Sequence, residues 1–301
     1  MKRVLVTGAG GQLATELVRW APLDAEVIAL GVDALDICDR ARIDAVFAEV
    51  RPDAVFNAAA YTAVDLAETE SDIADRVNHR AVADLRAACD ARGARFVHVS
   101  TDYVFDGESS RAYQPGDATC PTSVYGRTKR DGELAALKSH DALVVRTAWV
   151  YASHGKNFMR TMLRLMQERD EVRVVADQIG TPTSAAGLAR ALWSLHAAGA
   201  TGIHHWTDAG VASWYDFAVA IREESAALGF ATARTRVTPI RTVDYPTPAR
   251  RPAMGLLSKD ATWALLGRPA PHWREALRAT LAESSAASQA AAVTQSTTGA
   301  R

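Results

Sequence analysis

The glycine-rich segment close to the N-terminus constrains the fold of this chain more than any other feature of the sequence. Gly8, Gly10 and Gly11 follow the short apolar run 4–6, and a helical pattern begins directly afterwards at Gln12. Glycines at such a turn let the backbone approach a pyrophosphate, whose charge is favoured by the amide groups at a helix N-terminus. A glycine pattern alone is weak evidence, but the strand–turn–helix context predicts a dinucleotide-binding turn rather than an ordinary connection.

Short β-branched runs alternate with longer amphipathic segments through the first half of the chain. This alternation predicts parallel strands joined by helices, which is a Rossmann-type, doubly wound α/β sheet. Because such sheets bind their ligands at the carboxyl ends of the strands, we expect the functional residues there. The expected strands are 3–7, 26–30, 53–57, 95–100 and 143–147, and the expected helices are 12–20, 41–50, 71–92 and 124–139.

The rhythm changes twice, which predicts three regions. Residues 1–150 form the dinucleotide-binding Rossmann domain and carry the catalytic residues. Residues 151–283 form a smaller, mainly substrate-binding α/β domain whose boundary with the first is interleaved. Residues 284–301 contain almost no large apolar side chain, so they cannot offset their ordering entropy, and we expect a disordered tail.

Composition argues against several classes of function. The 34 Lys and Arg residues against 35 Asp and Glu residues give a net charge of −1, which supplies no field for gripping nucleic acid or an anionic membrane. The 3 cysteines form no CxxC pair, and His204 and His205 are the only neighbouring histidines, so we expect no metal site. Apolar runs are too short for a signal peptide or a membrane span, which predicts a cytoplasmic protein acting on a small molecule.

A candidate catalytic set follows the fourth strand and opens the next helix. Thr101 comes at the end of that strand, and Tyr125 and Lys129 lie four residues apart, on one helix face. An adjacent ammonium group lowers the pKa of a tyrosine towards the range in which it exchanges protons. A YxxxK spacing alone is usually just helix surface. Combined with the glycine turn and the Thr101 hydroxyl, it predicts an active site.

The second strand predicts the choice of cofactor. Dinucleotide folds that prefer NAD carry a carboxylate about 20 residues after the glycine turn, and Gly31 stands there in this chain. Asp33 can swing towards that place, and no arginine stands beside it. We therefore expect NADPH, with NADH tolerated. Asp36 and Ile37 fall where the next loop would line the adenine, although a plain solvent-facing aspartate fits the sequence equally well.

Further motifs resemble a known family. The glycine turn, NAAA at 57–60 and YxxxK at 125–129 together resemble the extended short-chain dehydrogenase/reductases. Longer strings resemble one branch of them, the dTDP-4-dehydrorhamnose reductase family, and only the tail after about Glu283 lies outside the resemblance. The strings most specific to that branch are STDYVFDG at 100–107 and YPTPARRP at 245–252. The resemblance also includes NAAAYTAVD at 57–65, RTAWVY at 146–151 and DQIGTPT at 177–183.

The resemblance implies NAD(P)H-dependent reduction of the C4 ketone of dTDP-6-deoxy-L-lyxo-hexulose to dTDP-L-rhamnose. Tyr125 would then give the proton, Lys129 would lower its pKa and bind the nicotinamide ribose, and Thr101 would steady the ketone oxygen. It further implies sugar contacts from Asp102 and Trp149. The cofactor contacts that it implies, beside Gly8 of the turn and the catalytic pair, are Gly11, Gln12, Leu13, Asp36, Ile37, Ala60, Tyr61 and Thr62.

The chain departs from the family's pattern in two places. Where the family commonly continues RPxNSxL, Pro252 is followed by Ala253-Met254-Gly255, which removes an Asn and a Ser from near the nucleotide-sugar. Some members join two subunits through carboxylates on magnesium. Glu16 fits one such position, but Ala186 stands at another. Mg²⁺ and a homodimer therefore rest on the resemblance alone.

Several alternatives stay open from the sequence. Arg250 and Arg251 can fork onto the substrate diphosphate, a use that suits guanidinium geometry, or can be an exposed basic pair. Another nucleotide-sugar epimerase or dehydratase of the superfamily would need further acid or base groups beside Thr101, where only Asp102 is available. A non-catalytic, cofactor-sensing regulatory subunit shares the fold, and the intact catalytic set argues against it.

Overall fold

A parallel sheet of six strands forms the centre of the larger domain in the computed structural model, which describes residues 2–298. The strand order is β10-β5-β4-β3-β1-β2, and every neighbouring pair is parallel. This confirms the expected doubly wound α/β class. The strands are β1 (Lys2–Thr7), β2 (Ala25–Leu30), β3 (Ala54–Asn57), β4 (Arg95–Thr101), β5 (Leu143–Thr147) and β10 (Gly202–His205).

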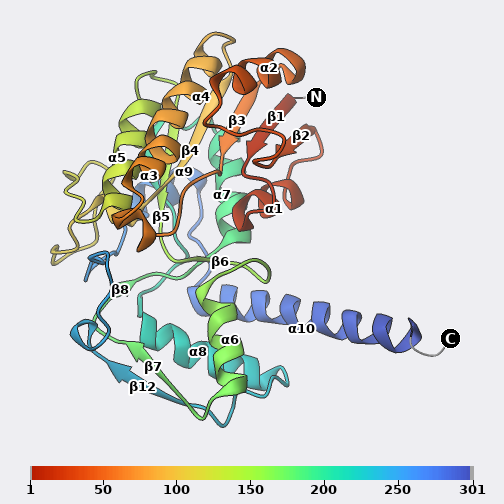
Figure 1. Cartoon of the computed structure of the whole chain (residues 1–301), viewed down its shortest axis with the longest axis vertical. Coiled ribbons are helices and arrows are strands. Elements are labelled where there is room, and N and C mark those ends of the chain that lie inside the picture. Colours follow the sequence, from red (N-terminus) through yellow and green to blue (C-terminus); the bar gives the residue numbers. More distant parts are fainter. Residues whose placement is uncertain (1, 299–301) are drawn as a thin grey trace.

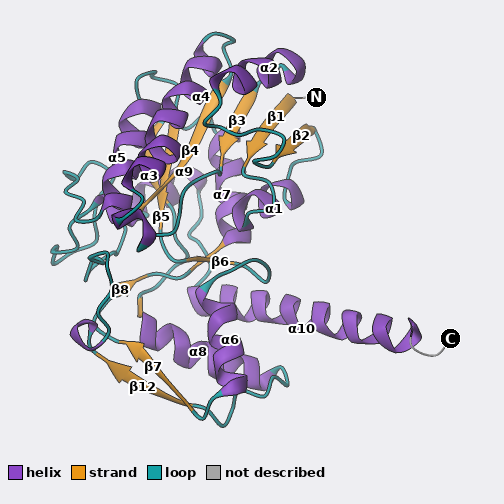
Figure 2. Ribbon diagram, in the orientation of Figure 1, coloured by secondary structure: helices purple, strands orange, loops and turns teal. Residues whose placement is uncertain are grey.

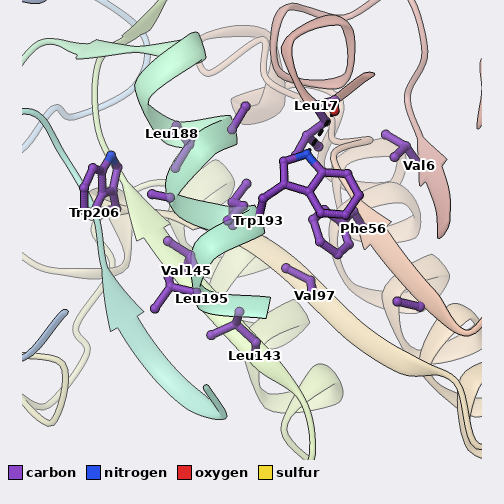
Figure 3. Packing of buried hydrophobic residues seen from close by; sticks show 14 of the residues in the cluster. Val6, Leu17, Phe56, Val97, Leu143, Val145, Leu188, Trp193, Leu195 and Trp206 are labelled. Atoms are coloured by element: carbon purple, nitrogen blue, oxygen red, sulfur yellow. Dashed lines mark hydrogen bonds between the residues drawn. The ribbon is translucent and has the colours of Figure 1, made fainter. Parts of the chain in front are cut away.

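Helices cover both faces of this sheet (Figures 1 and 2). One face packs against helices α1 and α7, where the Trp193 indole contacts Phe56 at 4.6 Å between ring centroids and donates a hydrogen bond to the Leu17 carbonyl at 3.0 Å (Figure 3). The opposite face packs against helices α2, α4 and α5. The helices of this domain are α1 (Gln12–Arg19), α2 (Arg40–Val50), α3 (Ser71–Asp75), the π-helical turn η2 (Arg76–Arg80), α4 (Ala81–Asp90), α5 (Val124–Ala136), α7 (Ala185–Ala197) and α9 (Asp260–Leu266).

The smaller domain buries its own apolar cluster around helices α6 and α8. Strands β7 and β12 pair in parallel beside them, and two short strand pairs, β6 with β9 and β8 with β11, connect the domains. Its elements are α6 (Phe158–Glu168), α8 (Trp214–Ala227), α10 (Trp273–Thr298), β6 (Val150–Tyr151), β7 (Glu171–Val175), β8 (Ile179–Gly180), β9 (Thr183–Ser184), β11 (Ala212–Ser213) and β12 (Arg236–Ile240). Short 3₁₀ turns occur in both parts of the chain: η1 (Leu66–Glu68), η3 (Asp102–Val104) and η4 (Thr242–Asp244).

The chain crosses between the two domains more than once. Strand β10 and helix α7 lie beyond residue 150, yet they complete the sheet and the apolar core of the larger domain. A single boundary at that residue therefore does not divide the structure, because β10 pairs with β5 and continues the sheet at its edge.

The C-terminal segment continues helix α10. This helix extends to Thr298 and projects beyond the body of the molecule (Figure 1), and the expected disorder of the tail from residue 284 stays a prediction. Elongating an existing helix adds one hydrogen bond per residue without a new nucleus, and the alanines in this stretch favour it. Residues 299–301 of the expected tail lie outside the described residues.

Candidate active site

A cleft of about 800 Å³ opens across the carboxyl ends of the central strands. Its walls come from the segments that follow β1, β2, β3 and β5 and from the end of β4, and Trp214 of helix α8 adds a wall from the smaller domain. The site is thus where a doubly wound sheet places its ligands. Of the predicted site residues, it brings together Gly8, Gly11, Gln12, Leu13, Asp36, Ile37, Ala60, Thr62, Thr101, Asp102, Tyr125, Lys129 and Trp149.

The glycine turn offers backbone amides to a ligand. Gly8 and Gly10 have φ of 76° and 86°, a conformation that favours glycine. A Cβ at Gly8 would lie 2.9 Å from the backbone of Ala59, whereas a Cβ at Gly10 would meet no atom within 4 Å. Helix α1 begins at Gln12 with no side chain capping its first amides. The turn therefore has both the space and the unused donors that a dinucleotide pyrophosphate requires.

The wall beside the glycine turn carries few charges. Asp36 lines the cleft, and its carboxylate accepts a hydrogen bond from the Cys38 amide at 2.9 Å. Asp33 is exposed and is not among the lining residues. Gly31 packs against the turn, because a Cβ there would lie 3.2 Å from the Ala9 carbonyl oxygen. The structure thus puts Asp36, rather than Asp33, in the cleft.

Helix α5 holds Tyr125 in its first turn. The Ser123 hydroxyl caps the helix by accepting from the Gly126 amide at 3.1 Å, and the Glu68 carboxylate accepts from the Val124 amide at 2.8 Å. A Cβ at Gly126 would lie 2.2 Å from the Tyr103 carbonyl oxygen, so only glycine lets the helix come this close to η3. The start of α5 is therefore fixed against the end of β4.

Burial controls the ionisation of Tyr125. Its pKa is raised to about 12, because burial opposes the phenolate and the Asp102 charge adds to this, while a hydrogen bond with Thr101 acts in the opposite direction. Tyr125 is therefore held in its protonated form, which a proton donor needs. The lowering of this pKa that we expected from Lys129 stays a prediction.

Lys129 is buried beneath the cleft. Its ammonium donates to the Val99 carbonyl oxygen at 2.7 Å and lies 3.4 Å from His98 Nε2. Burial lowers the pKa of Lys129 to about 8, and the Glu133 carboxylate one turn along the helix acts against this decrease. The lysine is therefore mostly a cation at neutral pH and loses its charge as the pH rises through about 8.

Thr101 and Asp102 form a short chain at the end of β4. The Thr101 hydroxyl donates to the Asp102 carboxylate at 2.9 Å, and burial raises the pKa of Asp102 to about 7. Gly255 lies directly against this carboxylate, because a Cβ there would be 2.5 Å from Asp102 Oδ2. The departure from the family's sequence at Met254-Gly255 thus falls beside Asp102.

Two tryptophans form an aromatic wall where the domains meet. Trp149 has φ of 50°, which is uncommon for a residue other than glycine. Its ring stacks on Trp214 with centroids 3.6 Å apart and planes 9° apart. Gly180 supports the other side, since a Cβ there would lie 2.8 Å from the Trp149 ring. The resemblance pointed to Trp149 but not to Trp214, which the chain brings in from the smaller domain.

Three predicted site residues do not line the cleft. Tyr61 donates its hydroxyl proton to Glu70. Arg251 makes a two-pronged ion pair with Asp65, at 3.0 and 2.7 Å, and exposed Arg250 pairs with Glu108 at 3.0 Å. Each charge already has a protein partner, so the contact of the arginine pair with a diphosphate stays a prediction. Gly31 was expected beside the adenosine ribose, but it packs against the glycine turn and is not among the residues that line the cleft.

Several polar groups in or under the cleft were missed from the sequence. Among residues 2–298, no hydrogen-bond partner lies within reach of the buried hydroxyls of Ser100 and Thr147, as expected for atoms that meet a ligand. Lys156 adds an exposed cation close to Gln12, whose amide donates to the Lys156 carbonyl at 3.3 Å. Single residues of these types have no characteristic spacing, so no signal in the sequence marks them.

Glu16 does not fit a magnesium site. Its carboxylate is buried and accepts hydrogen bonds from Trp20 Nε1 at 3.0 Å and His154 Nε2 at 2.9 Å. Within the part of the chain that the structure describes, no cluster of three or more His, Cys, Asp or Glu side chains is placed to hold a metal ion. Over the same residues, no helix is long and apolar enough to cross a membrane.

Known proteins resemble this chain over most of its length. The family model described as RmlD substrate binding domain matches residues 1–286. The dTDP-4-dehydrorhamnose reductase of Burkholderia thailandensis is 46% identical over 287 residues, which is 91% of this chain and 96% of that protein. The dTDP-4-keto-6-deoxy-D-glucose reductase of Streptomyces niveus is 42% identical over 91% of this chain and 95% of its own. The solved dTDP-4-dehydrorhamnose reductase of Bacillus anthracis, in complex with NADP, superposes with a TM-score of 0.88 and 34% identity over 94% of this chain and all (100%) of that one.

Proposed function

Because the chain belongs to the RmlD substrate binding domain family, we propose that it reduces the C4 ketone of dTDP-4-dehydro-L-rhamnose with NADPH to give dTDP-L-rhamnose. The observation that carries the proposal is the convergence of Thr101, Tyr125 and Lys129 on one cleft that begins at the glycine turn. This combination provides a dinucleotide site, a proton donor and a cation within one pocket.

NADPH, when bound, supplies the hydride that reduces the ketone carbon. Tyr125 gives its hydroxyl proton to the ketone oxygen, and its raised pKa keeps that proton in place until the oxygen becomes basic. Thr101 lies within hydrogen-bonding reach of Tyr125 and orients the hydroxyl. Lys129 places a positive charge beneath the tyrosine, where it would contact the nicotinamide ribose and favour the phenolate once the proton has left.

The cofactor fits the residues that line the cleft. The amide of Gly10 and the first amides of α1 would hold the pyrophosphate, with Lys156 as an added cation. Asp36, Ile37, Ala60 and Thr62 line the cleft beyond the turn, as the resemblance implied. The buried hydroxyls of Ser100 and Thr147, which have no protein partner, would meet groups of the ligand.

The substrate side lies between the catalytic strand end and the smaller domain. The Trp149–Trp214 stack presents a rigid aromatic wall, and such walls pack well against the apolar faces of a sugar or a base. Asp102 lines the same cleft and would accept a sugar hydroxyl when ionised. We infer that the smaller domain contributes to substrate binding mainly through Trp214.

A second candidate substrate comes from the Streptomyces niveus relative. That relative is named a dTDP-4-keto-6-deoxy-D-glucose reductase and shares 42% of its sequence with this chain. The two substrates carry the same C4 ketone, so the same proton donor and cation serve both reactions. An epimerase or dehydratase would need a further acid or base beside Thr101, and a cofactor-sensing subunit would have no use for the catalytic set.

Turnover with purified substrates tests the proposal. The protein is incubated with NADPH and either dTDP-4-dehydro-L-rhamnose or dTDP-4-keto-6-deoxy-D-glucose, and loss of the nicotinamide absorbance is followed. We expect consumption of NADPH with the first sugar, and a product that co-elutes with dTDP-L-rhamnose. Faster turnover of the second sugar would move the assignment to the Streptomyces activity, and no turnover of either would refute both.

A homodimer in the cytoplasm completes the proposed setting. Cys38, Cys89 and Cys120 are free thiols in the structure, which fits a reducing compartment. Because Glu16 is already bonded inside the subunit, we propose a dimer that does not need magnesium. Light scattering measures whether the protein is a dimer, and repeating it with a chelator measures whether the dimer needs magnesium.

A further inference from the structure

His98 is a fully buried histidine that the proposed reaction does not use. It lies on β4 beneath the cleft, with none of its surface exposed, between Asn57 of β3 and Lys129 of α5. Burial and the neighbouring lysine charge hold the pKa of His98 well below its ordinary value. The ring is therefore neutral and carries a single proton.

Hydrogen bonds on the Asn57 side decide where that proton is. The Thr7 hydroxyl accepts from the Ala59 amide at 3.2 Å, so it donates its own proton to Asn57 Oδ1, at 2.6 Å. The amide nitrogen of Asn57 then faces His98 Nδ1 at 3.1 Å and donates to it. Nδ1 is thus the acceptor, and the proton of the ring is on Nε2.

The Nε2 proton points towards Lys129. Nε2 and the lysine nitrogen are 3.4 Å apart, and both carry donors when the lysine is charged. The ammonium cannot give a proton to a nitrogen that already bears one. One of its three protons goes to the Val99 carbonyl oxygen at 2.7 Å, and the others are left to turn away from the sheet.

We propose that His98, held in one tautomer by Thr7 and Asn57, is a positioning residue that directs the ammonium protons of Lys129 towards the cleft. The tautomer part stands on its own, whereas the consequence for NADPH rests on the proposed function. In that setting the lysine meets the nicotinamide ribose with donors already aimed. A hydrogen-bond acceptor at the His98 position would draw the ammonium back to the sheet.

Other charged groups around Lys129 are already engaged. Glu133, one turn along α5, is held by Arg146 of β5 through two hydrogen bonds of 2.8 Å each. Asn78, from the π-helical turn packed against α5, is uncharged and donates to Thr128 at 3.2 Å. Tyr125 precedes the lysine on the same helix and stays protonated. His98 is thus the ring that faces Lys129 from the sheet.

Two substitutions alter the series of hydrogen bonds that runs from Thr7 through Asn57 and His98 to Lys129. Asn57→Asp places a carboxylate against Nδ1, which draws the ring proton there and makes Nε2 an acceptor for the ammonium. His98→Leu removes the ring altogether. We expect Asn57→Asp to raise the upper pH limit of kcat/KM by about one unit, because an acceptor favours charged Lys129. We expect Asn57→Asp to weaken NADPH binding by roughly tenfold, a change of one hydrogen bond to a charged group, and His98→Leu, which offers the ammonium no acceptor, to weaken it less. His204→Leu, on β10, is the matched control and should alter neither quantity.

Two readouts do not depend on the sugar substrate. Nitrogen NMR of ¹⁵N-histidine-labelled native protein should show His98 protonated at Nε2, and Asn57→Asp should move the proton to Nδ1. NADPH titration without sugar gives the affinities. The proposal is overturned by an Nδ1-protonated ring in the native protein. It is also overturned if affinity stays within about twofold of native in folded Asn57→Asp. Should His98→Leu fail to fold, these two measurements decide, and absence of turnover with either sugar would refute the proposed function but not the tautomer.

Discussion

The two ends of the cleft are built from different materials. At the β1 end the backbone of Gly8, Gly10 and Gly11 makes the binding surface, and its donors are amides that do not titrate. At the β4 end the working groups are buried side chains that do titrate. A pyrophosphate keeps its charge over the working pH range, so fixed dipoles suffice for it. Proton transfer requires groups whose pKa burial has shifted, so the dependence of the rate on pH should be set at the β4 end.

The largest effect should come from removing the proton donor. Tyr125→Phe should lower kcat by about 10²–10⁴-fold, the usual contribution of general acid catalysis, while NADPH affinity stays within a few-fold of native. Steady-state kinetics and NADPH titration measure the two quantities. Tyr103→Phe is the control, because Tyr103 packs edge-on against Tyr125 at 5.4 Å between ring centroids. A Tyr125→Phe variant that keeps more than about a tenth of the native rate would remove this residue from the donor role.

Two buried carboxylates, Asp102 and Asp208, should each lower folding stability as the pH rises. Burial raises the pKa of Asp102 and of Asp208 alike, to about 7 from 3.8. Both carboxyls ionise more readily in the unfolded chain, so each costs folding stability as pH rises from about 4 to 7, by roughly 4 kcal/mol at most. Asn at either position should therefore raise Tm at pH 8 but not at pH 4. Thermal melts at the two pH values measure this.

Activity should distinguish the same two carboxylates. Asp102 lines the cleft, whereas Asp208 accepts from the Ser184 amide at 2.9 Å next to the start of α7. Asp102→Asn should change the pH profile of kcat/KM near pH 7, and Asp208→Asn should leave it unchanged. Equal profiles for the two variants would show that Asp102 has no part in the reaction.

The cofactor end should respond through specificity. Gly31→Asp would supply an acceptor for the adenosine ribose and repel a 2′-phosphate, so the kcat/KM ratio should shift towards NADH by about ten- to a hundredfold. Gly31→Ala is the matched control, since its Cβ meets the same Ala9 carbonyl oxygen at 3.2 Å without adding charge. A native protein that already prefers NADH strongly would instead point to Asp36, which lines the cleft.

The smallest effect should come from the end of helix α10. Removing residues 287–301 deletes mostly small and polar residues that come after Leu281, a buried apolar residue of the helix. Activity and Tm should stay essentially native. A decrease in Tm of about 4 °C or more, which corresponds to on the order of 1 kcal/mol, would show that this segment packs against something.

The sequence by itself determined the features that depend on residues close together in the chain. The strand–glycine–helix start, the strand boundaries of the first half to within a residue, and the Tyr125 and Lys129 spacing all appear as expected. Local patterns of this kind depend on backbone conformation and on which face is apolar, and both are set within a few residues of chain.

Only the tertiary structure decided which distant residues meet. It returned α7 and β10 to the first sheet, stacked Trp214 on Trp149 and placed His98 behind Lys129. It also raised the pKa of Tyr125 through burial, because the cost of burying a charge depends on everything packed around it. A single histidine or tryptophan belongs to no sequence pattern that predicts its tertiary contacts. Its role is therefore fixed only when the strands and helices pack together.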